Sequence, residues 1–119
     1  MRRAAEKKMA HGTDARVVLV TCGSLAEGRT IARAAVEKRL AACVNLISGP
    51  VESIYRWKGK VERAKEFLLI IKTTERRLKE LEKEIAGLHS YAVPEFLVLR
   101  GETGSQKYLA WLIRESIGV

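Results

Sequence analysis

The sequence predicts an α+β fold in which an antiparallel sheet carries two helices on one face. Three observations predict it. A length of 119 residues suits one domain with its own hydrophobic core. Short apolar runs typical of strands are interrupted by two longer segments of helical period. A two-residue turn signal, Lys58-Gly59, joins two of the strands as a hairpin.

The first predicted strand and helix are directly joined. Residues 16–22 form an unbroken β-branched and apolar run, as expected of a strand covered on both faces, and Gly23 ends it. Ser24 and Glu27 then have the spacing of a capping box, which marks a helix start. Apolar residues recur at helical spacing from there, so the helix is predicted to run to about Arg39.

The middle of the sequence predicts strands. Residues 41–47 read as a strand that stops at Ser48-Gly49-Pro50. Polar and apolar side chains then alternate over 51–57, apart from Ile54, up to the hairpin turn. Residues 67–71 form the next buried run.

The C-terminal part completes the pattern. Leu78, Leu81, Ile85 and Leu88 define an amphipathic helix that starts near Thr74, and residues 96–99 form a further strand. Gly104-Ser105 opens a last helix, with Gly118 predicted just beyond its end. The first six elements follow the split βαβ, ferredoxin-like order, with an extra C-terminal helix.

The chain is expected to have one domain and a tail. Residues 1–15 are charged and lack the apolar core of a secretory signal, so we expect a flexible N-terminal tail followed by a domain at 16–119. No apolar run approaches the roughly 20 residues that span a bilayer. Cys22 and Cys43 form no C-x-x-C motif and are expected to be buried free thiols. We therefore expect a cytoplasmic protein with no membrane partner.

The composition excludes several function classes. A single Asp rules out an aspartic dyad and the Asp-dependent magnesium sites of kinases. The Gly-rich segment 101–107 lacks the Gly-Lys-Ser/Thr order of a phosphate loop. The net charge is +8, but Lys and Arg alternate with Glu, which favours a solvated surface over a nucleic-acid interface. We expect a binding and assembly protein, not an enzyme.

Two aromatic side chains indicate an interface. Tyr55 and Trp57 project from the predicted hairpin, which two helices do not fully cover. Large exposed aromatics there favour an oligomer interface. The alternative is that the third helix covers them within one chain.

The loop His89–Glu95 holds the candidate ligands. An imidazole and a carboxylate at a sheet rim can ligate a transition metal, with Cys22 as a soft third ligand. The alternative is that His89 caps the preceding helix, where a positive charge suits the dipole, while Glu95 faces water. Catalysis by a Cys and His89 is not favoured, because both thiols are expected to be buried.

Several segments together resemble the CutA divalent-cation tolerance proteins. The matching segments, in order, are 36–45, 53–60, 69–74, 89–95 and 108–111, and the resemblance spans about 16–117. It implies a ferredoxin-like subunit in a tight trimer, an architecture shared with PII-type signalling proteins. It also implies a non-enzymatic role in tolerance to divalent metals, with copper the ion most often discussed.

The family's ligands carry over in part. His89 and Glu95 stand where members with the pattern H-P-Y-x-x-P-E have their His and Glu, whereas Ser90 replaces the usual Pro. Some bacterial members have a Cys that is proposed as a metal ligand, and the corresponding position in this sequence is Val20. Cys22 lies two residues further along, on the same strand face.

The sequence thus predicts a homotrimer that binds divalent cations, copper or zinc, through His89, Glu95 and Cys22, with no obligatory cofactor and no nucleic-acid partner. The alternative is a trimeric PII-like signalling or scaffold module. Such a module would bind a small anionic effector or a partner protein in the cleft between subunits.

Overall fold

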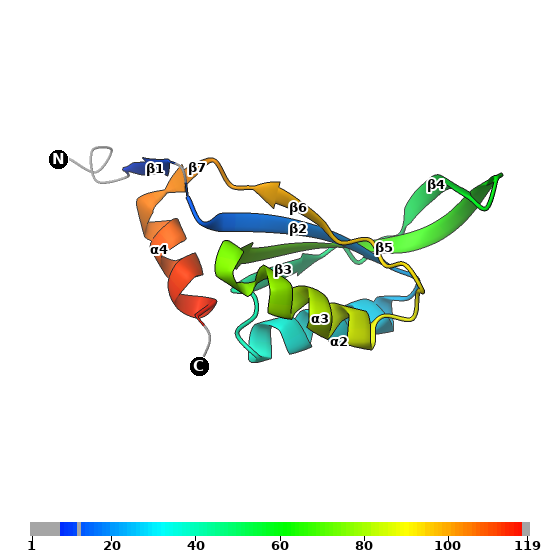
Figure 1. The fold of residues 1–119 in the computed structure, drawn as a ribbon, viewed down its shortest axis with the longest axis horizontal. Helices are drawn as coiled ribbons and strands as arrows, with labels where there is room; N and C mark the ends of the chain where they lie inside the picture. The colour runs from blue at the N-terminus through cyan, green and yellow to red at the C-terminus, as the bar shows by residue number, and fades with distance from the viewer. Residues whose placement is uncertain (1–7, 12, 118–119) are drawn as a thin grey trace.

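The computed structural model describes residues 8–11 and 13–117 (Figure 1). The elements in chain order are β1 (Met9–His11), β2 (Ala15–Cys22), α2 (Leu25–Glu37), β3 (Cys43–Leu46), β4 (Val51–Trp57), β5 (Lys60–Thr74), the 3₁₀ turn η1 (Glu75–Arg77), α3 (Leu78–Leu88), β6 (Leu97–Arg100), β7 (Thr103–Ser105) and α4 (Gln106–Glu115).

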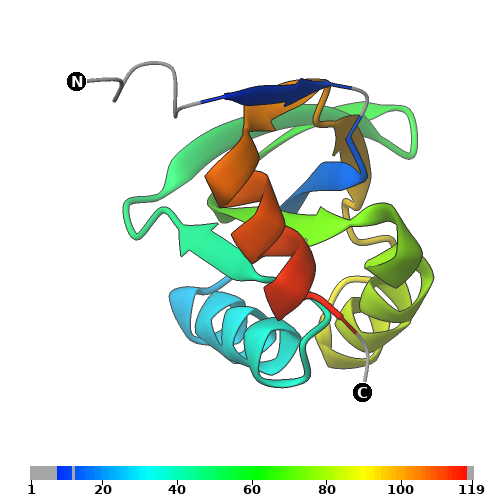
Figure 2. The same cartoon turned by 90° about the vertical axis from the view of Figure 1, so that its left-hand side faces the viewer.

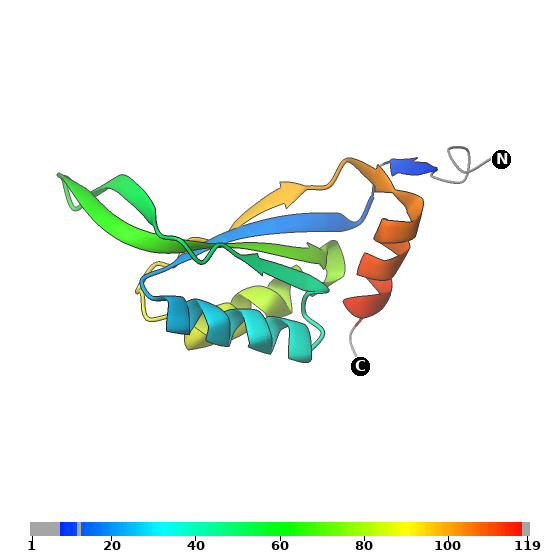
Figure 3. The ribbon, with the colours of Figure 1, turned by 180° about the vertical axis from the view of Figure 1, so that it is seen from behind.

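The main sheet has the strand order β3-β5-β2-β6, and each neighbouring pair is antiparallel. Strand β5 is 15 residues long; its second half lies between β3 and β2, and its first half pairs with β4. Helices α2 and α3 lie against the same face of this sheet (Figures 1 and 3). The predicted α+β class and antiparallel sheet are therefore confirmed.

The hydrophobic core lies between the sheet and these two helices. Alternate residues of β2 point into it: Val18 and Val20 are fully buried, as are their cross-strand partners Ile71 and Leu69. The helices contribute further fully or almost fully buried side chains, namely Ile31, Ala35, Leu81 and Ile85. Burying one such large aliphatic side chain stabilises the fold by about 1.5–3 kcal/mol.

The opposite face of the sheet is apolar but poorly covered. By strand alternation and register, six apolar side chains of β2, β5 and β6 lie on it beside Thr21 and Lys72. These six are here called the open face: Val17, Leu19, Leu68, Ile70, Leu97 and Leu99. No helix of the described residues packs across it in Figures 1 and 3. Leu97 and Leu99 remain 54% and 46% exposed. Such a patch is unusual on a monomer.

Helix α4 packs at one end of the sheet, beside β1 and β7 (Figure 2). Its Ser105 cap accepts a hydrogen bond from the Tyr108 backbone N–H at 3.2 Å, as the Gly104-Ser105 signal predicts. The hairpin β4–β5 projects from the other end of the molecule (Figure 1). Tyr55 and Trp57 are 44% and 46% exposed, so the idea that the third helix covers them is wrong.

The N-terminal segment differs from the flexible tail expected. Met9–His11 forms β1 and pairs with β7, so ordered structure begins before Arg16. These two strands have three residues each, too few to give a periodic signal. Residues 1–7 and 12, and Gly118 at the other end, lie outside the described residues.

The hairpin turn has the predicted geometry. Lys58 and Gly59 have φ values of 50° and 80°, both in the left-handed region that a two-residue hairpin of this kind requires. Within the described part of the chain, no helix has the length and hydropathy to cross a membrane.

Candidate metal centre

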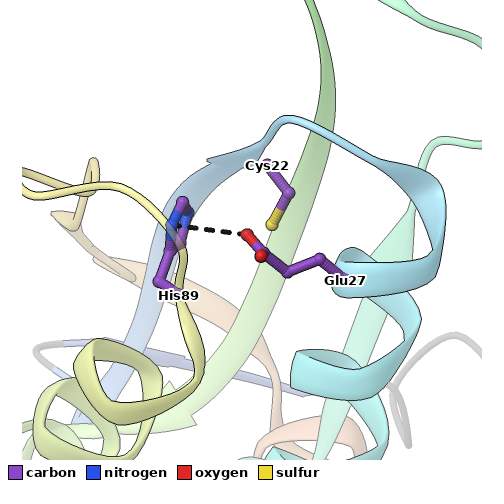
Figure 4. A group of neighbouring side chains, drawn as sticks. All are labelled: Cys22, Glu27 and His89. Atoms are coloured by element: carbon purple, nitrogen blue, oxygen red, sulfur yellow. Dashed lines mark ion pairs between the residues drawn. The ribbon is translucent and has the colours of Figure 1, made fainter.

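Three potential ligands meet where β2 leads into α2. Cys22 is the last residue of β2, Glu27 lies in the first turn of α2, and His89 directly follows α3. One ligand atom from each residue lies within 4.8 Å of the other two (Figure 4). The structure thus brings together two of the three predicted ligands, Cys22 and His89, and adds Glu27.

His89 is held in one orientation. Its side chain is fully buried, and Nε2 lies 2.7 Å from the Thr21 carbonyl oxygen. That carbonyl can only accept, so Nε2 carries the proton. Nδ1 accepts a hydrogen bond from the Tyr91 backbone N–H at 3.1 Å. A ring nitrogen that donates to a backbone carbonyl while the other nitrogen faces the site is the usual arrangement of a metal-binding histidine.

Glu27 is directed toward this histidine. Its Oε2 lies 3.4 Å from His89 Nδ1 and accepts a hydrogen bond from the Ser90 hydroxyl at 3.2 Å. Only half of the predicted capping box forms: Ser24 Oγ accepts from the Glu27 N–H at 3.2 Å. The Glu27 carboxylate instead lies beside His89 and Ser90. Ser90, which replaces the family's usual Pro, thus helps to hold Glu27.

Cys22 contributes a fully buried thiol. Burial, together with the negative charges of Glu27 and Glu66, raises its pKa to about 11. The thiol is therefore protonated at neutral pH in the absence of an ion. The second cysteine, Cys43, differs from the buried thiol expected, because it is partly exposed on β3.

This contrast predicts different reactivities of the two thiols. At about pH 7.5 in the absence of metal, we expect iodoacetamide to alkylate Cys43 at least about tenfold faster than Cys22, because reaction requires an accessible thiolate. Mass spectrometry of the peptides over time measures both rates in one sample. Equal rates would show that the thiol of Cys22 is neither buried nor protonated in solution.

Glu95 lies apart from the three clustered ligands. It lines a neighbouring pocket of about 670 Å³, between the 91–95 loop and the β4–β5 hairpin. Partial burial and the negative charge of Glu66 raise its pKa above the usual range. Glu95 as a metal ligand stays a prediction, and it is not one of the group formed by Cys22, Glu27 and His89.

Tyr91 separates the metal cluster from the pocket. Its ring lies 4.7 Å from that of His89, centroid to centroid, and its hydroxyl donates to Glu66 Oε2 at 2.9 Å. Burial and this hydrogen bond raise the Tyr91 pKa to about 12. Gly23 leaves room for the tyrosine, since an added Cβ there would lie 3.1 Å from Tyr91 Oη.

Most of the chain is similar to known proteins. A family model described as the CutA1 divalent ion tolerance protein matches residues 16–115. The chain belongs to the CutA family. The resemblance drawn from the sequence is therefore confirmed.

This CutA chain matches a bacterial relative over nearly the whole length of that relative. It is 48% identical over 102 residues to the divalent-cation tolerance protein CutA of Thermus thermophilus, covering 86% of this chain and 97% of the relative. The solved structure of Cut A1 from Thermus thermophilus matches with a TM-score of 0.84 and 44% identity, covering 87% of this chain and 99% of that one.

An archaeal CutA structure is also similar. The periplasmic divalent cation tolerance protein CutA from Archaeoglobus fulgidus matches with a TM-score of 0.83 and 35% identity, over 87% of this chain and 99% of that one. Because that relative is described as periplasmic, the cytoplasmic location of this CutA chain stays a prediction.

Proposed function

We propose that this CutA chain is a homotrimeric, non-enzymatic protein that binds copper or zinc ions and acts in divalent-cation tolerance in the cytoplasm. One observation carries the metal-binding proposal. Cys22, Glu27 and His89 come from three separate elements, yet their ligand atoms lie within 4.8 Å of one another.

The donor set suits these ions chemically. A thiolate from Cys22 and the carboxylate of Glu27 supply two negative charges, which balance a divalent cation, and His89 adds a neutral nitrogen. Thiolate and imidazole favour copper and zinc, whereas magnesium and calcium prefer oxygen ligands.

The site needs only a small adjustment. Around a tetrahedral zinc ion, ligand atoms lie about 3.5 Å apart, whereas these three lie within 4.8 Å of one another, so each pair would have to close by about 1.3 Å at most. Nδ1 of His89 would exchange its hydrogen bond from Tyr91 for the ion. The Nε2 bond to Thr21 is retained, so the ring keeps its orientation.

The open face supports the assembly. Its six apolar side chains, including the half-exposed Leu97 and Leu99, would leave water if the sheets of several chains packed together. We take the number three, the ferredoxin-like subunit and the PII-like arrangement from the family resemblance. Light scattering should give about 40 kDa, three times the 13.3 kDa of one chain.

The anionic-effector alternative has no specific support at the pocket. The charged side chains that line it are Glu66 and Glu95, and no Lys or Arg of the described residues lines it. Two carboxylates repel an anion.

Calorimetric titration of zinc, and of copper, tests the proposed site. We expect His89→Ala to weaken binding at least about a hundredfold, because removal of even a supporting group costs 10–100-fold. His11→Ala is the matched control, since His11 is exposed on β1 far from the cluster in sequence. Equal binding by wild type and His89→Ala would show that the metal ion does not bind at the proposed site.

A further inference from the structure

The pocket beside the metal cluster has the size of a small-molecule site. Its volume is about 670 Å³, within the range of ligand pockets. Its walls come from β4, the first half of β5 and the 91–95 loop, which are distant in sequence. A single metal ion would leave most of this volume empty.

The buried carboxylate of Glu66 marks the polar end of the pocket. Glu66 is only 8% exposed, and Oε2 accepts one hydrogen bond, from the Tyr91 hydroxyl at 2.9 Å. Within residues 8–11 and 13–117, no Lys, Arg or His lies at ion-pair distance from it. A buried carboxylate without a cation is costly, so a positively charged ligand in the pocket would be stabilised by Glu66.

The remaining walls favour an organic cation. Tyr55, Trp57 and Tyr91 line the pocket. Aromatic rings attract ammonium groups through their negative faces. Glu95 adds a second carboxylate at the same site. This acidic, aromatic lining contrasts with the net charge of +8 on the whole chain.

We propose that the pocket between the β4–β5 hairpin and the 91–95 loop binds a small organic ammonium ion, with Glu66 as its counter-charge and Trp57 as its aromatic contact. A hydrated metal ion gains little from aromatic walls, and an anion would face two carboxylates. This proposal goes beyond metal binding and does not depend on it.

The test is calorimetric titration with choline and ethanolamine in the presence of EDTA, so that metal binding plays no part. The matched neutral probe is 3,3-dimethyl-1-butanol, which has the shape of choline without its charge. Citrate serves as the anionic probe. We expect both ammonium probes to bind, and the neutral and anionic probes to bind at least about tenfold more weakly.

Variants locate the binding. Glu66→Gln keeps the shape and an acceptor for Tyr91 but removes the charge, and we expect it to weaken choline binding at least about tenfold. Trp57→Leu should also weaken it. Glu82→Gln, an exposed carboxylate on α3, makes the same charge change outside the pocket and should leave binding unaltered.

Four results would overturn the proposal. They are no binding of either ammonium probe at millimolar concentration, equal binding of the neutral probe, binding unchanged in Glu66→Gln, or tighter binding of citrate. Light scattering of Glu66→Gln adds a fifth: dissociation of the assembly would show that a basic side chain of a second copy neutralises Glu66. None of these results bears on whether zinc binds at His89.

Discussion

Replacing Leu97 and Leu99 together by lysine is expected to reduce the assembly to monomers. Both leucines lie on β6, on the open face, and are half exposed in the single chain. If that face packs against other copies, two ammonium groups would be buried without partners. Each costs several kcal/mol, which exceeds what a subunit interface tolerates. Light scattering should then give 13.3 kDa.

The control is a lysine on the other side of the molecule. Val36 on α2 is 41% exposed, and Val36→Lys should leave the mass of the assembly unchanged. Circular dichroism establishes that both variants are folded. If the double variant formed an assembly of wild-type mass, the open face would not be the interface. If the wild-type protein were a monomer, the proposed assembly would be wrong.

The fold could be predicted where the signals are local. The apolar run of β2, the Ser24 cap and the Lys58-Gly59 turn each depend on neighbouring residues alone, and each appears in the structure. Strand β5 was harder to predict as one 15-residue unit. Four of the six residues 60–65 are charged, and the segment pairs only with β4, so it lacks the buried pattern of the second half.

The site could be predicted only in part. Cys22 and His89 are rare residue types at the ends of predicted elements, which makes them visible in the sequence. Glu27 was missed as a ligand because the spacing of a capping box fully explains a Glu at that position. Only the packing of the start of α2 against the end of α3 shows that its carboxylate faces His89.

Nearness in sequence was misleading for the loop after α3. Glu95 follows His89 by six residues, but the chain between them runs along the pocket and separates the two side chains. Nothing in the sequence marked Glu66 as a pocket residue, because it is one Glu in a charged strand segment. Its burial results from the approach of Tyr91, a contact between residues 25 positions apart.

Zinc binding is expected to weaken about tenfold for each unit by which the pH is lowered between about pH 9 and about pH 7. The thiol of Cys22 has a pKa of about 11, so it is protonated throughout this range. An ion that takes the thiolate must displace that proton, and competition by protons rises as the pH falls. Apparent dissociation constants from chelator competition, and proton release measured by calorimetry in two buffers, check both effects.

Cys22→Ser should remove this pH dependence and weaken zinc binding at least about a thousandfold. A serine hydroxyl stays protonated at these pH values, so it offers neither the negative charge nor the soft donor of a thiolate. Cys43→Ser is the matched control, because Cys43 lies on β3 outside the cluster and its loss should leave both affinity and proton release unchanged. If Cys22→Ser still released one proton per zinc ion with wild-type affinity, the ion would be held elsewhere. The three-element cluster would then be a structural hydrogen-bond network that fixes the loop after α3.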